Sequence, residues 1–304
     1  MKLLQTICAW LIAVYCLAQP SLGDKLRNEG DLEGAIAAYK KIYNDNASKK
    51  SNTYNLACAY ALMYQIDSAF HYLNIALKSD NTLWSLADPD LMSLIDDTRW
   101  DDVVENQMAK YQKENGPLEE PEYALKLLLI IKKDQALDYY IDQAKKEFMK
   151  KGQAPHWYYP LRSMKQQLAS SNFKELEDLL LENGWPKYSK VGKLAADAPL
   201  LVINHHENDL VRKQYIEQIK EACLSGEGSC MEYAKIQDRI LVNDNLPQLY
   251  GMQFRYNKKR KLEPFPVQDP EFVDQRRAEI GLEPLSSYLQ RKIDYNWNVE
   301  QKTN

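Results

Sequence analysis

The first half of the chain repeats one pattern of apolar and polar positions at a separation of 34 residues. The pattern appears in GDLEGAIAAYKKIY (30–43) and again in YQIDSAFHYLNIAL (64–77). Ala35 and Ala69 occupy the same point of the two stretches, and the apolar positions around them are matched. One helix pair cannot bury its apolar stripe alone, so repeated pairs stack on one another. The pattern therefore predicts stacked helix pairs.

This 34-residue period resembles the tetratricopeptide repeat. The stretch YNLACAYALM (54–63) fits the first helix of the second unit, because its small side chains let helices approach closely. Residues 83–104 fit a third, degenerate pair or a cap, with a helix start at Asp88-Pro89. We expect the repeat domain to span residues 22–113 and to bind a protein or peptide partner in its groove. The alternative is that it only packs against the second half.

Apolar periodicity predicts further helices in the second half. Residues 124–148 form one long amphipathic pattern, and the helical pattern of 170–186 ends at a glycine and a proline. Ser229-Cys230-Met231-Glu232 has the form of a capping box, in which the serine side chain bonds the first turn of a helix. That helix would carry Asp238 and Arg239.

A short β-hairpin is predicted near the end of the chain, where QLYGMQFRY (248–256) and KLEPFPV (261–267) can pair. The run ENGPLEEPE (114–122) is charged, contains two prolines and fits a domain boundary. The expected fold is therefore mostly α: a tetratricopeptide-like α-solenoid, then a helical domain over 122–290 with one small β-hairpin. A C-terminal tail follows over 291–304.

The N-terminal stretch has the form of a secretory signal peptide. Lys2 precedes an apolar run over residues 3–17, and Ala18 supplies a small residue for cleavage. We expect residues 1–18 to be removed and the protein to be exported to the periplasm, the outer envelope or the extracellular space. No later apolar run is long enough for a stable transmembrane segment.

Charge and cysteine content narrow the function classes. The formal net charge of −4 argues against a nucleic-acid binder, which would be basic overall. Cys223 and Cys230 flank the turn-like LSGEGS, and in an oxidising compartment they either form a disulfide or stay as two thiols. Cys58 is expected in the core. No Cys/His spacing resembles a zinc site, and we expect no metal or cofactor.

Five motifs of the second half occur in a fixed order along the chain. They are GWPKYSKVG (184–192), Asn204-His205, Asp238-Arg239, PQLYGMQ (247–253) and RRAEIGL (276–282). The set resembles the bacterial family catalogued as domain of unknown function 6624, over roughly the last 170 residues. That family has no established activity, so the resemblance implies a fold and a set of marked positions rather than a reaction.

The chain departs from the family pattern at three of these positions. Asn204 stands where the family has Gln, which keeps the amide but shortens it, and Met252 stands in place of Thr. An earlier element of the pattern is matched by Asp134-Gln135, but Asp138 stands where the family often has Arg.

His205 is the leading candidate for chemistry. On a helix through 191–206 it shares one stripe with Leu194 and Leu201 and should point inward, whereas His206 should be more exposed. One interpretation is a core histidine that bonds a backbone carbonyl. The other is a general base or ligand-binding imidazole at the floor of a pocket.

We assign a role beside His205 to each of the other marked residues. For catalysis we name Asp238, as the group that orients His205, and Tyr250, which would stabilise charge. For ligand binding we name Arg239 as an anion binder, together with Gln248, Gln253, Asn204 and Trp185. The alternatives are a helix-surface ion pair at Asp238-Arg239 and a rigid polar core in which the amides and Tyr250 satisfy one another. Gly251 would permit a backbone geometry or close approach that a side chain would block.

Two functions stay open. The first is an envelope interaction protein with a polar ligand-recognition domain. The second is a hydrolase or transferase that uses His205 as base and binds a small anionic ligand through Arg239. The sequence contains no G-x-S-x-G nucleophile motif and no P-loop motif. The basic run RYNKKRK (255–261) is either a solvated turn or a contact for an anionic surface or ligand.

Overall fold

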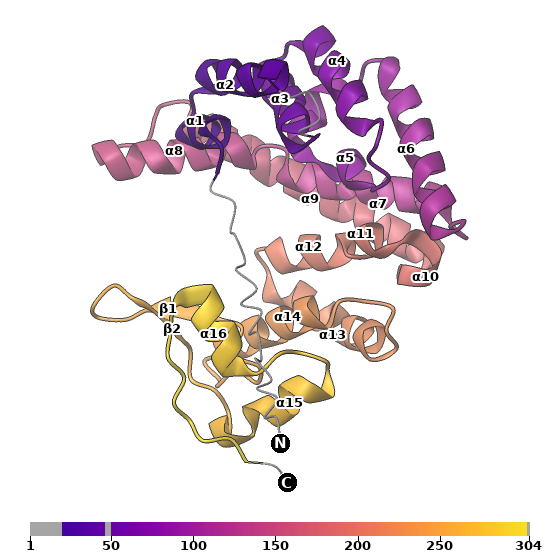
Figure 1. The fold of residues 1–304 in the computed structure, drawn as a ribbon. Coiled ribbons are helices and arrows are strands. Elements are labelled where there is room, and N and C mark those ends of the chain that lie inside the picture. The colour runs from indigo at the N-terminus through magenta and orange to yellow at the C-terminus, as the bar shows by residue number, and fades with distance from the viewer. Residues whose placement is uncertain (1–19, 46–49, 303–304) are drawn as a thin grey trace, which may run out of the picture.

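The structure is a computed structural model that describes residues 20–45 and 50–302 (Figure 1). The expected signal peptide lies outside the described residues. The fold is mostly helical with one small antiparallel hairpin, which confirms the predicted fold class. Among the described residues, no helix is both long and apolar enough to cross a membrane.

In the described residues, six α-helices and one 3-10 helix form the N-terminal block. Consecutive helices pack against one another from α1 to α4, consistent with the predicted helix pairs. Asp88 accepts a hydrogen bond from the backbone N–H of Asp90 at 2.9 Å and starts η1, so the predicted helix start at Asp88-Pro89 is confirmed. The elements are α1 (Leu22–Glu29), α2 (Leu32–Asp45), α3 (Lys50–Leu62), α4 (Ile66–Leu77), α5 (Trp84–Ala87), the 3-10 helix η1 (Pro89–Leu94) and α6 (Arg99–Asn115).

A central group of helices joins this block to the rest of the chain. Its first helix, α7, contacts α5 and η1 of the N-terminal block. It also contacts α9, α11 and α12 of its own group. The connection at 116–120 separates α6 from α7, but one hydrophobic core continues across it, from Ala35 in α2 to Val202 in α12. The elements are α7 (Pro121–Gln135), α8 (Asp138–Lys151), α9 (Tyr158–Asn183), α10 (Tyr188–Val191), α11 (Lys193–Ala196) and α12 (Ala198–His205).

Two helices expected to be continuous are interrupted. The pattern of 124–148 breaks between α7 and α8, although no glycine or proline stands there. Tertiary contacts explain the break, since the hydroxyls of Tyr139 and Tyr140 in α8 donate to backbone carbonyls of α1 and α3 at 3.1 and 2.8 Å. The helix expected through 191–206 is divided into α10, α11 and α12.

The C-terminal part has a second hydrophobic core, built from α12 to α16 and the hairpin. The side chain of Ser229 accepts from the N–H of Glu232 at 3.3 Å at the start of α14, as predicted. In the hairpin, Phe254 pairs with Pro264, and the ribbon projects from the body of the molecule (Figure 1). The elements are α13 (Asp209–Leu224), α14 (Cys230–Asn243), β1 (Phe254–Tyr256), β2 (Leu262–Pro264), η2 (Pro270–Phe272), α15 (Val273–Glu279) and α16 (Leu285–Ile293).

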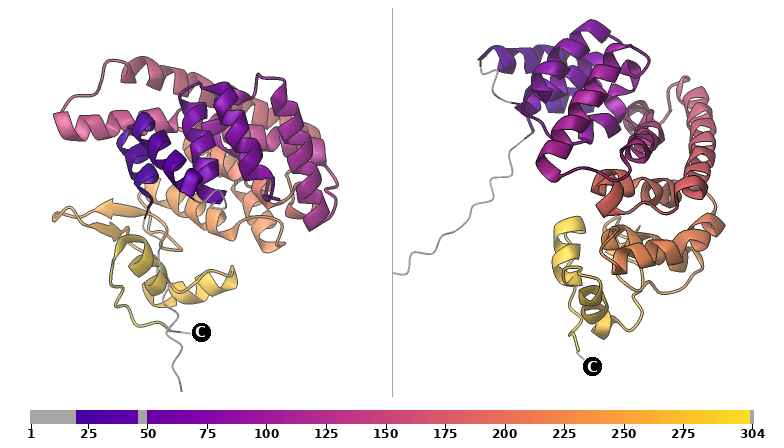
Figure 2. Two further views of the ribbon diagram at one scale, coloured as in Figure 1. Left: turned by 45° about the horizontal axis from the view of Figure 1, so that its top comes forward. Right: turned by 90° about the vertical axis from the view of Figure 1, so that its right-hand side faces the viewer.

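The two cores meet at α12. Figure 2 shows the helices of the first core stacked above those of the second, with the α12 region between them. Val202 of α12 belongs to the first core and Ile203 to the second, so this short helix is held on both sides. His205 is its last residue and therefore lies where the two parts of the molecule adjoin.

Candidate functional site

The segment after α14 is held by one buried carboxylate. Asp238 has no exposed surface, and its oxygens accept from the backbone N–H groups of Leu249 at 2.7 Å, Tyr250 at 3.0 Å and Met252 at 2.9 Å. Burial raises the pKa of Asp238 to about 6, against the opposing effect of these N–H donors. The carboxylate therefore organises a backbone turn and does not contact His205.

The amides of the same segment are also used within it. Gln248 is fully buried; its amide donates to the carbonyls of Phe265 at 2.9 Å and Gln253 at 3.2 Å and accepts from the N–H of Gln253 at 2.8 Å. The amide of Gln253 donates to the carbonyl of Lys235 at 2.9 Å. Buried amides need such partners. Both side chains therefore connect this segment to α14 and to the chain after the hairpin.

The RRAEIGL motif clamps the segment from the other side. Arg277 has no exposed surface, donates to the carbonyl of Glu283 at 2.6 Å and also donates to the carbonyl of Tyr250. Gly251 has φ +78°, and a Cβ there would lie 2.4 Å from Leu285. The close approach expected at Gly251 is thus confirmed.

The structure does not bring several of the predicted site residues to His205. Asp238, Gln248 and Gln253 bond the backbone described above, and the ring of Tyr250 packs edge-on to Tyr233 at 5.9 Å. Trp185 packs beside Tyr215 in the second core, with ring centroids 6.2 Å apart. Among the residues described, this geometry is that of a rigid scaffold.

His205 pairs with a different carboxylate. Its Nδ1 lies 2.8 Å from Oδ2 of Asp134, which is the second-last residue of α7. The Asp134 side chain is 5% exposed, while that of His205 is 48% exposed. A carboxylate on Nδ1 fixes the imidazole tautomer that carries its proton there, so the lone pair of Nε2 faces outward. Within the described residues, Nε2 has no hydrogen-bond partner.

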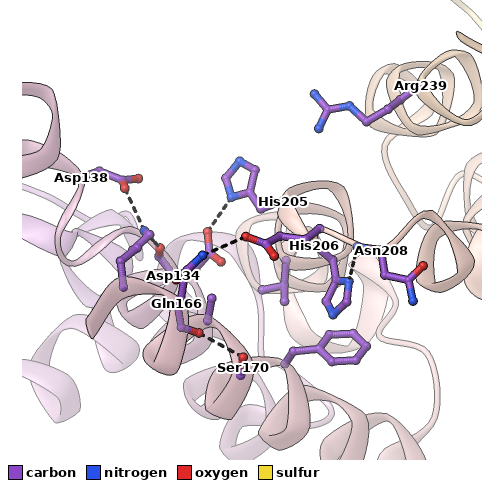
Figure 3. Close-up of a pocket in the computed structure, with 13 residues that line it drawn as sticks. Asp134, Asp138, Gln166, Ser170, His205, His206, Asn208 and Arg239 are labelled. Atoms are coloured by element: carbon purple, nitrogen blue, oxygen red, sulfur yellow. Dashed lines mark hydrogen bonds and ion pairs between the residues drawn. The ribbon is translucent and has the colours of Figure 1, made fainter. Parts of the chain in front are cut away.

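The imidazole opens into a cavity of about 600 Å³. Figure 3 shows His205 between Asp138 at the start of α8 and Arg239 on α14, with Gln166 and Ser170 of α9 below. A cavity of this size accommodates a small molecule. The lining residues are Asp134, Asp138, Lys165, Gln166, Ala169, Ser170, Phe173, Val202, His205, His206, Glu207, Asn208 and Arg239.

Two cations line the cavity, and they differ in how far their charge is compensated. Lys165 forms an ion pair with Asp138 at 2.8 Å and donates to the backbone carbonyl of Asp134, so it braces the α7–α8 junction. Arg239 has no ion-pair partner among the described residues. Burial and, to a lesser extent, the neighbouring Arg212 lower the pKa of Arg239, while the carboxylate of Asp209 opposes this shift.

Arg239 is held by the end of α12. Its guanidinium donates to the carbonyl of Asn204 at 2.9 Å, and Arg212 donates to the same carbonyl at 2.9 Å. The last carbonyls of a helix lack intrahelical partners and attract cations. This contact leaves other N–H groups of Arg239 for a ligand. The side-chain oxygen of Asn204 is buried and has no hydrogen-bond partner among the described residues.

The exposures of the two histidines are the reverse of the expectation. His205 is the more exposed, while His206 is half-buried and its ring lies 4.5 Å from that of Phe173. The expectation assumed one straight helix, but Gly192 and Pro199 divide it, and His206 leaves the helix with extended ψ of 139°. The prediction that His205 points inward is therefore wrong. The prediction that it lies at a pocket agrees with the cavity.

A disulfide joins Cys223 and Cys230, whose Cα atoms are 4.7 Å apart. Cys58 is buried and free. Among the described residues, one group has oxygen and sulfur atoms close enough to hold a metal ion: Cys58, Asp88 and Asp90, within 4.8 Å of one another. It lies in the N-terminal block, and Asp90 there is paired with Arg27.

Sequence reasoning identified the histidine but not its carboxylate. Asp134 was marked by the DQ element and given no role, because a contact over 71 residues cannot be read from periodicity. Lys165 and Gln166 carried no signal, since polar residues on a long helix are ordinary solvent-facing positions. Ser170 was predicted only as the start of the helical pattern of 170–186, and that start is wrong because α9 begins at Tyr158.

Comparison with known families identifies the second part of the chain. Residues 121–300 match the family of unknown function DUF6624, and because the match covers more than half of the chain, the protein belongs to that family. No curated protein matches the chain, and no solved structure matches it.

Proposed function

We propose that residues 121–300 form a recognition domain for a small anionic molecule and that it acts on this molecule as a hydrolase or transferase. In this proposal His205 is the general base. The observation that carries it is the buried Asp134 carboxylate 2.8 Å from Nδ1 of a half-exposed His205 at the wall of a 600 Å³ cavity.

The dyad supplies the base. With its proton held at Nδ1 by Asp134, the imidazole can accept a proton at Nε2 from a water molecule or a substrate hydroxyl, and Asp134 then stabilises the cation that forms. A carboxylate–histidine pair of this kind commonly contributes a factor of about 10² to 10⁴ to the rate. The hydroxyl of Ser170 already donates to the carbonyl of Gln166 at 3.0 Å, so water or a second substrate is the favoured nucleophile.

The anion site is assigned to Arg239. A half-buried guanidinium without a carboxylate partner is costly unless an anion compensates it, and its planar donors match phosphate and carboxylate oxygens. Asp138 and Glu207 at the rim disfavour a second large anionic group on their side. The expected ligand is therefore polar, with one anionic group directed to α14.

The proposal predicts separate kinetic effects of the two sides of the pocket. In a hydrolysis assay with phosphate esters and carboxylate esters, His205→Gln and Asp134→Asn should each lower kcat by about 10²-fold or more, because both remove the oriented base. Arg239→Ala should act mainly on KM, because it removes ground-state binding of the anion.

His156→Gln is the matched control, since His156 is exposed and distant in sequence from the dyad. Its kinetics should equal those of the wild type. Turnover of a substrate that persists unchanged in both His205→Gln and Asp134→Asn would refute the catalytic assignment.

We further propose that residues 22–113 are a tetratricopeptide-like array that binds a protein or peptide partner. The supporting observation is a second cavity, of about 520 Å³, whose wall includes Arg27, Tyr54 and Trp84. The consecutive packing of α1 to α4 fits stacked repeats. The carboxylates of Asp80, Asp88 and Asp90 line this cavity, and they favour a basic or amide-rich segment.

We also propose that the protein is exported to the periplasm or outer envelope. The signal-like pattern of residues 1–18 supports export. The Cys223–Cys230 bridge is in keeping with it, because disulfides persist in oxidising compartments and are rare in the cytosol.

A further inference from the structure

Two projections of the molecule are strongly basic, although the chain as a whole is acidic. The helical tip, defined as residues 145–162, contains the end of α8 and the start of α9. The hairpin tip, defined as residues 255–263, contains parts of β1 and β2 and the turn between them. Each tip holds five Lys or Arg and one Glu, a net charge of +4, whereas the whole chain has −4. The rest of the chain therefore carries −12.

Most of this positive charge is not neutralised within the protein. In the helical tip Lys145 pairs with Asp142 at 3.0 Å and Lys151 with Glu147 at 2.8 Å, and in the hairpin tip Arg255 pairs with Glu263 at 2.9 Å. Across residues 20–45 and 50–302, the other cations at the very ends of the two tips have no ion-pair partner. These are Lys150, Arg162, Lys258, Lys259, Arg260 and Lys261, and all of them are exposed.

Large apolar side chains stand among these cations. In the helical tip Met149 is 84% exposed and Tyr159 64% exposed, and Phe148 and Trp157 are also exposed. In the hairpin tip Tyr256 is 73% exposed. A single exposed apolar residue is ordinary, but four within twelve positions form a patch that needs an explanation.

The two tips lie on the same side of the molecule. In Figure 1 the free end of α8 and the β1–β2 hairpin both extend to the left, and the tilted view of Figure 2 shows the same arrangement. They are separated by the α12 region and do not form one continuous surface. A partner must therefore reach two projections that stand apart.

We propose that the helical tip and the hairpin tip together dock the protein on an anionic lipid bilayer. Lysine and arginine are attracted to anionic headgroups, and exposed Trp, Tyr, Phe and Met enter the interfacial region beside them. A bilayer is broad enough to meet both tips at once. The apolar side chains favour a bilayer over nucleic acid, whose phosphates would use the cations alone. The contact is peripheral.

The test is co-sedimentation of the mature protein with vesicles of phosphatidylcholine, alone or with about one third phosphatidylglycerol. We expect binding to the anionic vesicles only, weakened on raising salt to about 0.15 M or above. In the double variant Lys258→Glu/Lys259→Glu the affinity should fall at least about tenfold, since each cation at a membrane surface contributes about fivefold.

A second variant addresses the other tip and the apolar contribution. Lys150→Glu/Trp157→Ala should also weaken binding at least about tenfold. The matched control is Lys126→Glu/Lys220→Glu, which reverses two exposed cations on α7 and α13, away from both tips, and should bind as the wild type does. All four positions of the two test variants are exposed, so folding should be retained.

Equal binding of the wild type and both tip variants would overturn the proposal, as would equal binding to neutral and anionic vesicles. Self-association in the absence of vesicles that the same substitutions abolish would also overturn it, because the tips would then be an interface between copies of the chain.

Discussion

One carboxylate determines which histidine of the His205-His206 pair is suited to act as a base. Asp134 is buried at the end of α7 and bonds Nδ1 of His205, whereas His206 packs on Phe173 and its Nδ1 accepts from the N–H of Asn208 at 3.0 Å. The adjacent histidines are therefore not interchangeable. Polar residues in this protein acquire their roles from partners far away in the sequence.

Buried Lys132 gives a prediction at the same scale. Its ammonium lies 3.9 Å from the ring of Trp100 and 3.3 Å from the carbonyl of Ser85, and burial lowers its pKa to about 7. Above pH 7 the folded state has released this proton, while the unfolded state keeps it up to its ordinary pKa of about 10.5. The unfolding free energy should therefore rise with pH, by up to about 1.4 kcal/mol per unit.

The measurement is urea unfolding between about pH 7 and 8, below the pKa of a free cysteine (about 8.5) and of a free tyrosine (about 10). Lys132→Met should lose this part of the slope, and Lys126→Met, an exposed change in the same helix, should keep it. A slope that is the same in Lys132→Met and the wild type would show that Lys132 stays charged in the folded protein.

At the scale of elements, the family motifs fall into two groups. Asp238, the PQLYGMQ segment and Arg277 bond one another and fix a turn between α14 and β1. Asp134 of the DQ element, His205 and Arg239 line the cavity instead. Asp238 and Arg239 therefore belong to different groups, because neighbouring residues on a helix point about 100° apart.

This division predicts the effect of Asp238→Asn. The amide keeps one acceptor but turns an NH₂ group toward two of the three backbone N–H donors, so the unfolding free energy should fall by about 2 kcal/mol. Asp178→Asn, an exposed change on α9, should alter it by less than about 0.5 kcal/mol. Chemical denaturation measures both. Should Asp238→Asn prove as stable as the control, the carboxylate would not be the organiser of this turn.

Local sequence signals predicted the elements better than their breaks. Four features could be predicted because each depends on residues close together in sequence. They are the helix start at Asp88-Pro89, the cap at Ser229, the close approach at Gly251 and the β-hairpin. The break between α7 and α8 was not readable. It depends on tyrosines of α8 that bond α1 and α3, more than 70 residues earlier. The Asp134–His205 pair is a long-range contact of the same kind.

At the scale of the whole molecule, the cavity lies where two cores adjoin. The α7 and α9 side of the cavity belongs to the first core, and Arg239 stands on α14 of the second. A ligand that contacts both His205 and Arg239 would therefore stabilise the two parts relative to each other. Thermal unfolding is sensitive to such a ligand, because binding to the folded state alone raises the midpoint.

The most direct measurement is thermal unfolding of the mature protein and of His205→Ala, each alone and with nucleotides, sugar phosphates and cell-wall fragments. We predict a ligand that raises the midpoint of the wild type by several degrees at about a hundredfold excess over its Kd. The same ligand should not shift His205→Ala, whose unliganded midpoint should be near that of the wild type because the side chain is half-exposed. A variant that melts several degrees lower, with no ligand that shifts either protein, would contradict the account: His205 would then support the fold, and the function would lie in the N-terminal helices.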